Sequence, residues 1–177
     1  EVIIYINKVL MIKDKFINIL KIIYNFFEAL YIKINPVFTY YRNGIYYNLD
    51  LREVIDFSIY KNGYWEKYTH RFINTYIKSN DIVIEVGANV GSHTLPIAYK
   101  IKPEGQIHAF EPSRNAFVKL RKNIQLNKEL KKNIYLNNCF VSINKKEKKD
   151  NIRSSWYSNK SKKIKDENLD SDINVLT

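Results

Sequence analysis

Cysteine is nearly absent from this sequence: its 177 residues include one, Cys139. A single cysteine excludes an internal disulfide and any zinc site that is built from several cysteines. Because Cys139 lies in an apolar run, we interpret it as a small core residue. The sequence predicts no metal site.

Acidic residues are also few, with 18 Asp and Glu against 29 Lys and Arg, which gives a formal charge of +11. Such an excess would suit nucleic acid, an anionic membrane surface or an acidic glycan. The same excess is expected where nucleotide bias fills a sequence with Ile, Asn, Lys and Tyr together. Charge therefore does not select a partner. With 45% hydrophobic and 14% aromatic residues, the chain can build a packed core, and we expect a globular protein.

Long uncharged apolar runs are missing as well. Apolar residues between positions 3 and 32 recur at helical spacing, and Lys21 and Glu28 interrupt every window long enough to cross a membrane. We do not expect residues 3–32 to be a secretory signal, because they contain no uninterrupted apolar centre followed by a small-residue cleavage site. We predict an amphipathic helix over residues 1–35 that either packs on its own domain or lies at a membrane interface. The predicted location is the cytoplasm, with the second alternative adding peripheral contact to the inner face of the membrane.

Residues 36–80 predict a β-hairpin followed by two short helices. Aromatic β-type runs flank Asn43 and Gly44, and Asn-Gly is the favoured pair for a type I′ hairpin turn. Helical spacing follows around residues 54–59, and Gly63 closes that segment. A second helical pattern covers residues 68–77 and ends before the next strand.

From residue 81 the pattern becomes that of an α/β protein. Residues 82–86 form a continuous β-branched run, which is typical of a parallel strand that is buried on both faces. Helical and strand patterns then alternate over residues 92–101, 106–110, 113–124 and 134–141. This order predicts a doubly wound parallel sheet with right-handed crossovers. We assign residues 81–177 to this domain, and expect a fragment because "INVL" before Thr177 is typical of the start of another strand.

The turn after the first strand of this sheet carries the candidate site. In an open α/β sheet, ligands bind beyond the carboxyl ends of the strands. Gly87, Asn89 and Gly91 lie in that turn, where Gly87 would allow a tight turn and Gly91 a close approach to a ligand. A dinucleotide fingerprint requires G-x-G-x-x-G, and here the middle position carries a side chain and the third glycine is missing.

Acidic residues at two strand ends favour another cofactor. Glu85 ends the first strand, where its carboxylate would repel a diphosphate but attract the sulfonium and α-ammonium groups of S-adenosyl-L-methionine. Glu111 ends the second strand, where an acid can accept hydrogen bonds from both ribose hydroxyls. The order of acid, glycine, asparagine and glycine on predicted strand ends therefore predicts S-adenosylmethionine as the cofactor.

The motifs "IEVGANVGSHTLPIA" and "GQIHAFEPSRNAFVKLRKNIQLN", with "YYRNGIYYNLDL" and "NGYW" upstream, resemble the FkbM family of S-adenosylmethionine-dependent methyltransferases. The resemblance covers residues 38–142. It implies the first three strands of a Rossmann-like class I methyltransferase fold and methyl transfer to a hydroxyl of a sugar, glycolipid or related small molecule. The charge leaves a nucleic-acid methyltransferase open, but the sequence contains no recognisable RNA-binding module or stacking platform, so we expect no nucleic-acid partner. By this resemblance the cofactor-binding residues are Glu85, Gly87, Asn89, Gly91, Glu111 and Pro112, with 138–140 near the adenine.

Family members continue with a strand resembling "KIDVEGAE", which carries acidic residues into the active site, and the present chain stops before it. No general base is therefore assigned, and His93, at the start of the helix after the glycine turn, is the nearest candidate. A nicotinamide-dependent oxidoreductase and a non-catalytic membrane-associated binding fragment remain as alternatives. Because the first strand would keep a bare edge, we also expect self-association.

Overall fold

The computed structural model describes residues 2–142 and 174–176, and the chain divides into two compact units at Pro36. The first unit is the helix α1, Val2–Ile34, which confirms the helix predicted from the sequence. Its large apolar side chains from Met11 onward are exposed, except for the half-buried Ile32. No helix among the described residues is long and apolar enough to span a bilayer. Peripheral membrane contact through this helix stays a prediction.

The second unit, which begins at Val37, opens with the predicted hairpin. Strand β1, Val37–Arg42, pairs antiparallel with β2, Ile45–Asp50. At the turn, Asn43 has φ 52° and Gly44 has φ 82°, and a type I′ turn requires positive φ at both positions. Every second side chain of β2 is buried, which fixes the face of the hairpin that meets the rest of the unit.

Two helices lead from the hairpin into the sheet: α2, Val54–Asn62, and α3, Lys67–Tyr76. Gly63 ends α2 with φ 85°, and its backbone N–H donates to the Ile59 carbonyl, as expected for a glycine C-cap. Contacts of β2 with two later helices, α4, Thr94–Ile101, and α5, Arg114–Gln125, join this segment to the sheet, so residues 37–80 and the sheet belong to one compact unit.

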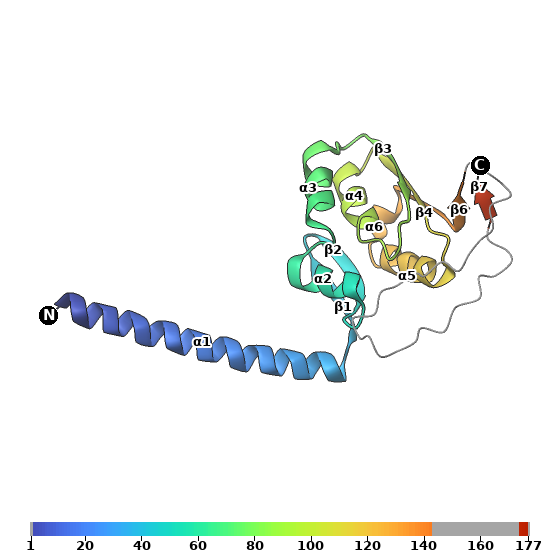
Figure 1. Cartoon of the computed structure of the whole chain (residues 1–177). Coiled ribbons are helices and arrows are strands. Elements are labelled where there is room, and N and C mark those ends of the chain that lie inside the picture. The colour runs from blue at the N-terminus through green and yellow to red at the C-terminus, as the bar shows by residue number, and fades with distance from the viewer. Residues whose placement is uncertain (1, 143–173, 177) are drawn as a thin grey trace. The chain divides into compact units, whose positions relative to one another are not determined.

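The central sheet has three parallel strands in the order β3, β4, β5. The strands are β3, Ile82–Val86, β4, Gln106–Phe110, and β5, Ile134–Asn137; the helices between them are α4, Thr94–Ile101, α5, Arg114–Gln125, and α6, Lys128–Lys131 (Figure 1). This alternation confirms the predicted incomplete Rossmann-like α/β architecture. Pro96 is tolerated because α4 starts at Thr94, which places the proline in the first turn, where backbone N–H groups lack helical partners.

The third predicted strand, residues 134–141, is broken in two. Strand β5 ends at Asn137, and β6, Cys139–Val141, pairs in parallel with β7, Asn174–Leu176. A strand therefore forms where "INVL" predicted one. Cys139 is buried, as expected for a core residue. The predicted loop at 142–172 lies almost entirely outside the described residues.

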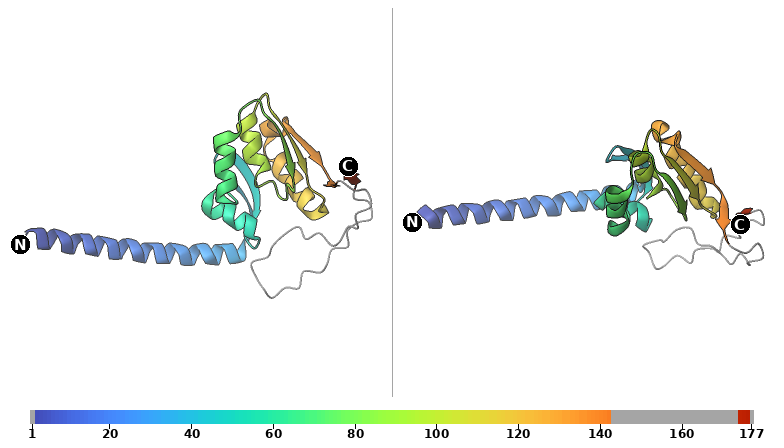
Figure 2. Two further views of the ribbon diagram at one scale, coloured as in Figure 1. Left: turned by 45° about the horizontal axis from the view of Figure 1, so that its top comes forward. Right: turned by 90° about the horizontal axis from the view of Figure 1, so that it is seen from above.

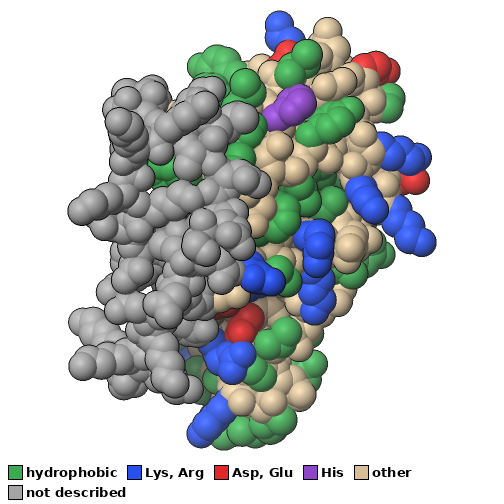
Figure 3. Space-filling model, turned by 90° about the vertical axis from the view of Figure 1, so that its right-hand side faces the viewer, with side chains coloured by type: hydrophobic (Ala, Val, Ile, Leu, Met, Phe, Trp, Pro, Cys, Tyr) green, Lys and Arg blue, Asp and Glu red, His purple; other side chains and the backbone are tan. Residues whose placement is uncertain are grey.

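The two faces of the sheet differ in their covering (Figure 2). Ile107 and Ala109 of β4 have no exposed surface, whereas Ile82 and Ile84 of β3 are 71% exposed. Successive right-handed crossovers in one direction place α4 and α5 on the same face, which leaves the other face open. In Figure 3, hydrophobic side chains reach the surface between basic ones. Strand β3 is an edge strand of the described sheet, and self-association through it stays a prediction.

Candidate active site

The turn between β3 and α4, residues 87–91, is held at the carboxyl end of the sheet by backbone hydrogen bonds. Gly87 N and Ala88 N both donate to the carbonyl oxygen of Phe110, at 2.8 and 3.0 Å. Three residues in the turn have positive φ: Gly87 at 86°, Asn89 at 49° and Gly91 at 91°. Residues 87–91, hereafter the glycine loop, thus have a fixed path at the edge where α/β sheets bind ligands.

The two glycines of this loop have different roles. A Cβ at Gly87 would meet nothing within 4 Å, so the backbone there is open to an approaching ligand. A Cβ at Gly91 would lie 2.8 Å from Cδ1 of Leu120 on α5. Gly91 therefore allows close packing against α5, a role that the sequence interpretation did not include, and its predicted approach to a ligand stays a prediction.

Glu85 is the last residue but one of β3, close to the strand end where it was predicted, and it is half-buried beside the start of α4. The hydroxyl of Thr94 donates to Oε2 of Glu85 at 2.6 Å. Burial raises the pKa of Glu85 to about 7, with a further increase from Glu111, although the Thr94 hydrogen bond opposes the shift. A carboxyl group with this pKa gains from a cation placed beside it, because the cation stabilises the ionised form.

Glu111 follows β4 directly and is 5% exposed. Its Oε2 accepts a hydrogen bond from Asn89 N and its Oε1 accepts one from Ser113 N, both at 2.8 Å. Burial raises the pKa of Glu111, and these two backbone N–H groups limit the rise. The carboxylate therefore connects the glycine loop to the start of α5. Each oxygen keeps a second lone pair, so the predicted ribose contact stays a prediction.

Pro112 and Asn138 lie at the ends of neighbouring strands. The side-chain amide of Asn138 donates to the carbonyl oxygens of Glu111 and Pro112, at 2.7 and 3.3 Å. This contact connects the break between β5 and β6 to the end of β4. It places the residues predicted near the adenine at the same edge as the glycine loop.

His93, the residue before α4, meets a partner that the sequence interpretation missed. Its Nε2 lies 3.4 Å from Oε2 of Glu66, the residue before α3. Glu66 has φ 30°, which is rare for a residue with a side chain, and its carboxylate caps no backbone N–H of its own helix. The hydroxyl of Thr69 donates to the same oxygen at 3.0 Å. Glu66 directly follows the "NGYW" motif, and this position was the only sign in the sequence that could have drawn attention to it.

The environment of His93 keeps its ring neutral near pH 7. Burial lowers the pKa of His93, and the positive charge of a protonated His70 would lower it further, while Glu66 opposes both effects. The side chain of Glu66 is 55% exposed and that of His93 is 20% exposed. A neutral imidazole beside an accessible carboxylate can accept a proton. Within residues 11–142, no group of three potential metal ligands was found.

Comparisons with known proteins add the following. No protein-family model matches the sequence, and no curated protein matches it. Solved structures with a similar fold include M. jannaschii TYW2 in complex with AdoMet, at 22% identity and TM-score 0.44 over 57% of this chain and 42% of that one. P. horikoshii TYW2 in complex with MeSAdo has 23% identity and TM-score 0.45 over 60% of this chain and 37% of that one.

A third similar structure is a Clostridium thermocellum protein provisionally named an rRNA-methylase, with 19% identity and TM-score 0.39 over 41% of this chain and 39% of that one. The chain thus spans less than half the length of these three proteins. The rRNA-methylase contradicts the predicted partners, a small-molecule or glycan acceptor with no nucleic acid. That prediction is corrected here. The identities below 25% bear on the fold and leave the activity to be tested.

Proposed function

We propose that this chain carries the cofactor-binding half of an S-adenosylmethionine-dependent methyltransferase of the FkbM type. The observation that carries the proposal is the half-buried carboxyl group of Glu85 at the end of β3, beside a glycine loop whose middle position is Asn89. The carboxylate matches the cationic groups of the cofactor, and the Asn89 side chain departs from a diphosphate-binding turn. The family resemblance over residues 38–142 supports the same assignment.

The residues would divide the chemistry between cofactor and acceptor. Glu85 and the open backbone at Gly87 would hold the methionine end, and Glu111 would hold the ribose. S-adenosylmethionine, when bound, would supply an electrophilic methyl group and leave as the neutral thioether, and the acceptor hydroxyl that receives the methyl group would lose one proton. We assign that proton to His93, because Glu66 at 3.4 Å would stabilise the imidazolium that forms. Positioning of the two reactants would supply most of the rate enhancement.

The acceptor in this proposal is an anionic molecule that carries hydroxyl groups, with RNA as the first to be tested. The formal charge of +11 on the chain supports an anionic acceptor, since basic surfaces concentrate polyanions. Transfer to oxygen follows from the family resemblance. We therefore expect methyl incorporation into a ribose hydroxyl if RNA is the acceptor.

Ligand titration of the purified chain tests the cofactor assignment. We expect S-adenosylhomocysteine to bind and NADH to bind at least about 100-fold more weakly, because the loop lacks the second glycine that lets a backbone touch a pyrophosphate. Isothermal calorimetry with both ligands gives the comparison. Preferential binding of NADH would favour the oxidoreductase alternative, and binding of neither ligand would favour the non-catalytic alternative.

The assignment of His93 predicts a separation between binding and turnover. His93→Ala should reduce methyl transfer by about 10²–10⁴-fold, the usual contribution of a general base, and leave the affinity for S-adenosylhomocysteine within about twofold. The measurement is transfer of a labelled methyl group to RNA. His70→Ala is the matched control, since the ring of His70 lies near the pair but stacks on Tyr64, and the hydrogen bond from His70 N to the Glu66 carbonyl oxygen does not use the side chain. Equal losses in both variants would remove His93 from the mechanism.

A further inference from the structure

One face of α5 is polar and buried, and it lies against the hairpin segment rather than against the sheet. Lys119 and Asn123 of α5, and Asn127, the residue before α6, recur at spacing four along this side of the chain. Asn127 contacts the backbone of Tyr46 on β2: its Oδ1 accepts from Tyr46 N at 2.9 Å and its Nδ2 donates to Tyr46 O at 2.7 Å. The free edge of β2 is thus hydrogen-bonded to side chains near the end of α5.

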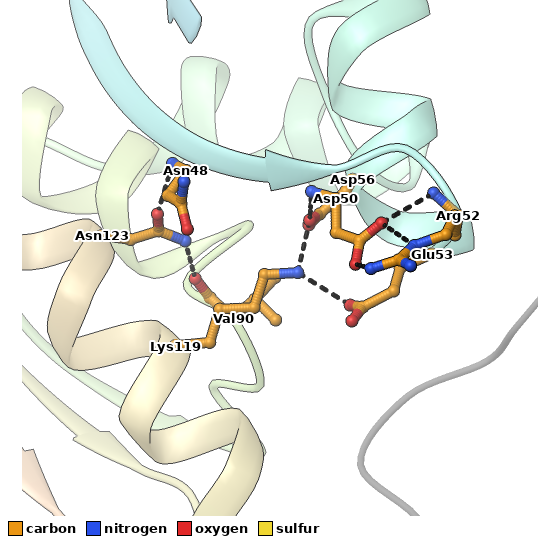
Figure 4. Close-up of polar contacts among 8 residues, drawn as sticks. All are labelled: Asn48, Asp50, Arg52, Glu53, Asp56, Val90, Lys119 and Asn123. Atoms are coloured by element: carbon orange, nitrogen blue, oxygen red, sulfur yellow. Dashed lines mark hydrogen bonds and ion pairs between the residues drawn. The ribbon is translucent and has the colours of Figure 1, made fainter. Parts of the chain in front are cut away.

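Asn123 differs from Asn127 because it also reaches the glycine loop (Figure 4). Its Oδ1 accepts a hydrogen bond from Asn48 N on β2 at 2.7 Å, and its Nδ2 donates to the carbonyl oxygen of Val90 at 2.8 Å. The side chain is 1% exposed. The Asn48 N–H requires an oxygen opposite it, so the orientation of the Asn123 amide is fixed and its NH₂ group must face Val90.

Val90 occupies the part of the loop where the backbone is most constrained. It lies between Asn89, with φ 49°, and Gly91, with φ 91°, and is itself 2% exposed. A residue with a side chain at positive φ is held there by its surroundings. Two different elements hold this part of the loop. Asn123 on α5 donates to the carbonyl oxygen of Val90, and Glu111, directly after β4, accepts from the N–H of Asn89.

We infer that Asn123 is a positioning residue for the glycine loop, and that it couples the edge of β2 to the cofactor pocket. Asn48 on β2 and Val90 in the loop bind the same side-chain amide, so a displacement of β2 would shift the donor that holds Val90. The effect on the stability of the loop follows directly from these contacts, while the effect on the affinity for S-adenosylmethionine rests on the proposed function.

A matched pair of variants separates this role from a general contribution to folding. Asn123→Asp keeps the oxygen that accepts from Asn48 N and replaces the donor to Val90 with a second oxygen. Asn127→Asp makes the same chemical change four residues further along the chain, just before α6, where the lost donor contacts Tyr46 O and Asn123 O instead of the loop. Both positions are buried, so both variants are expected to lose stability.

Hydrogen exchange in the full chain without ligand gives the first measurement. The N–H groups of Gly87, Ala88, Asn89 and Gly91 are all hydrogen-bonded and report on the loop. We expect Asn123→Asp to raise their exchange rates by about tenfold relative to Asn127→Asp, as for the loss of one hydrogen bond. Equal rates in the two variants would overturn the inference. If Asn123→Asp does not fold, Asn123→Ala, which adds no charge and favours helix, replaces it with the same expectation.

S-adenosylhomocysteine binding gives the second measurement. We expect Asn123→Asp to weaken binding by about tenfold and Asn127→Asp to leave it within about twofold. If the unmodified chain does not bind this ligand, the proposed function fails, and the exchange comparison still decides the role of Asn123. If the chain binds but both variants weaken binding equally, the coupling between β2 and the pocket is refuted.

Discussion

Replacing Lys119 by methionine is expected to destabilise the protein by about 3–5 kcal/mol, which is the cost of leaving a buried carboxylate without its cation. The ammonium group of Lys119 contacts Oδ2 of Asp56, which has no exposed surface, and Oε2 of Glu53 at 2.8 Å (Figure 4). Burial lowers the pKa of Lys119, but the two carboxylates outweigh burial and raise it. Urea unfolding at pH 7 measures the loss. Lys122→Met, at an exposed position of the same helix, should change stability by less than about 0.5 kcal/mol.

The stability that Lys119→Met loses should be smaller at pH 5 than at pH 7. Burial raises the pKa of Asp56 to about 6 although Lys119 attracts its ionised form. A carboxyl group whose pKa is raised by folding contributes stability below its unfolded pKa, and this contribution is lost as pH rises towards the folded pKa. At pH 5 the protonated Asp56 needs no cation, so Lys119 matters less. A loss that is equal at both pH values would contradict the assigned titration. Adding Asp56→Asn to Lys119→Met should restore part of the stability.

Local patterns predicted the elements that position the site. The Asn43-Gly44 pair specified the hairpin turn because few residues other than asparagine and glycine accept two successive positive φ values. The β-branched run at 82–86 and the alternation after it specified the parallel strands β3 to β5, and through them the end of the sheet where ligands bind. These features depend on neighbours in the sequence, so one sequence is enough to find them.

Contacts between distant segments were not predicted. Nothing near Asn123 in the sequence indicates that its amide joins Asn48 to Val90, and the pairing of His93 with Glu66 depends on how α3 packs beside α4. The close packing of Gly91 against α5 was missed in the same way, since its neighbour Leu120 comes from the next helix along the chain. Side-chain partners of this kind follow from tertiary packing, which a periodicity argument does not contain.

These distant contacts share one feature, which is that they converge on the glycine loop and the residues beside it. Glu111 binds the loop from β4, Asn123 binds it from α5, and Thr94 binds Glu85 from α4. Glu111 and Asn123 thus hold the loop itself, and Thr94 holds the carboxylate beside it. A loop prepared in this way loses less conformational freedom on binding, which favours affinity.

Replacing Glu85 by glutamine is expected to stabilise the free protein and to weaken cofactor binding. Folding raises the pKa of Glu85 from 4.5 to about 7, so the ionised form is disfavoured in the folded state by up to about 3 kcal/mol. The stability that Glu85 contributes below pH 4.5 is therefore lost as pH rises to 7. Glu85→Gln removes this loss and can still accept from Thr94. Urea unfolding should show a gain of about 1–3 kcal/mol at pH 8 and almost none at pH 4.5.

The same substitution should reduce the affinity for S-adenosylmethionine by about 30-fold or more, since a hydrogen bond to a charged group contributes about 2 kcal/mol. A bound cation beside Glu85 would favour the carboxylate, so binding to the unmodified protein near pH 6 should release a proton. Calorimetry in two buffers of different ionisation enthalpy measures that proton, and Glu85→Gln should abolish its release. The affinity of the unmodified protein should accordingly rise between pH 6 and 8, while that of Glu85→Gln should stay flat. Equal pH dependence in both proteins would mean that Glu85 does not face the cofactor.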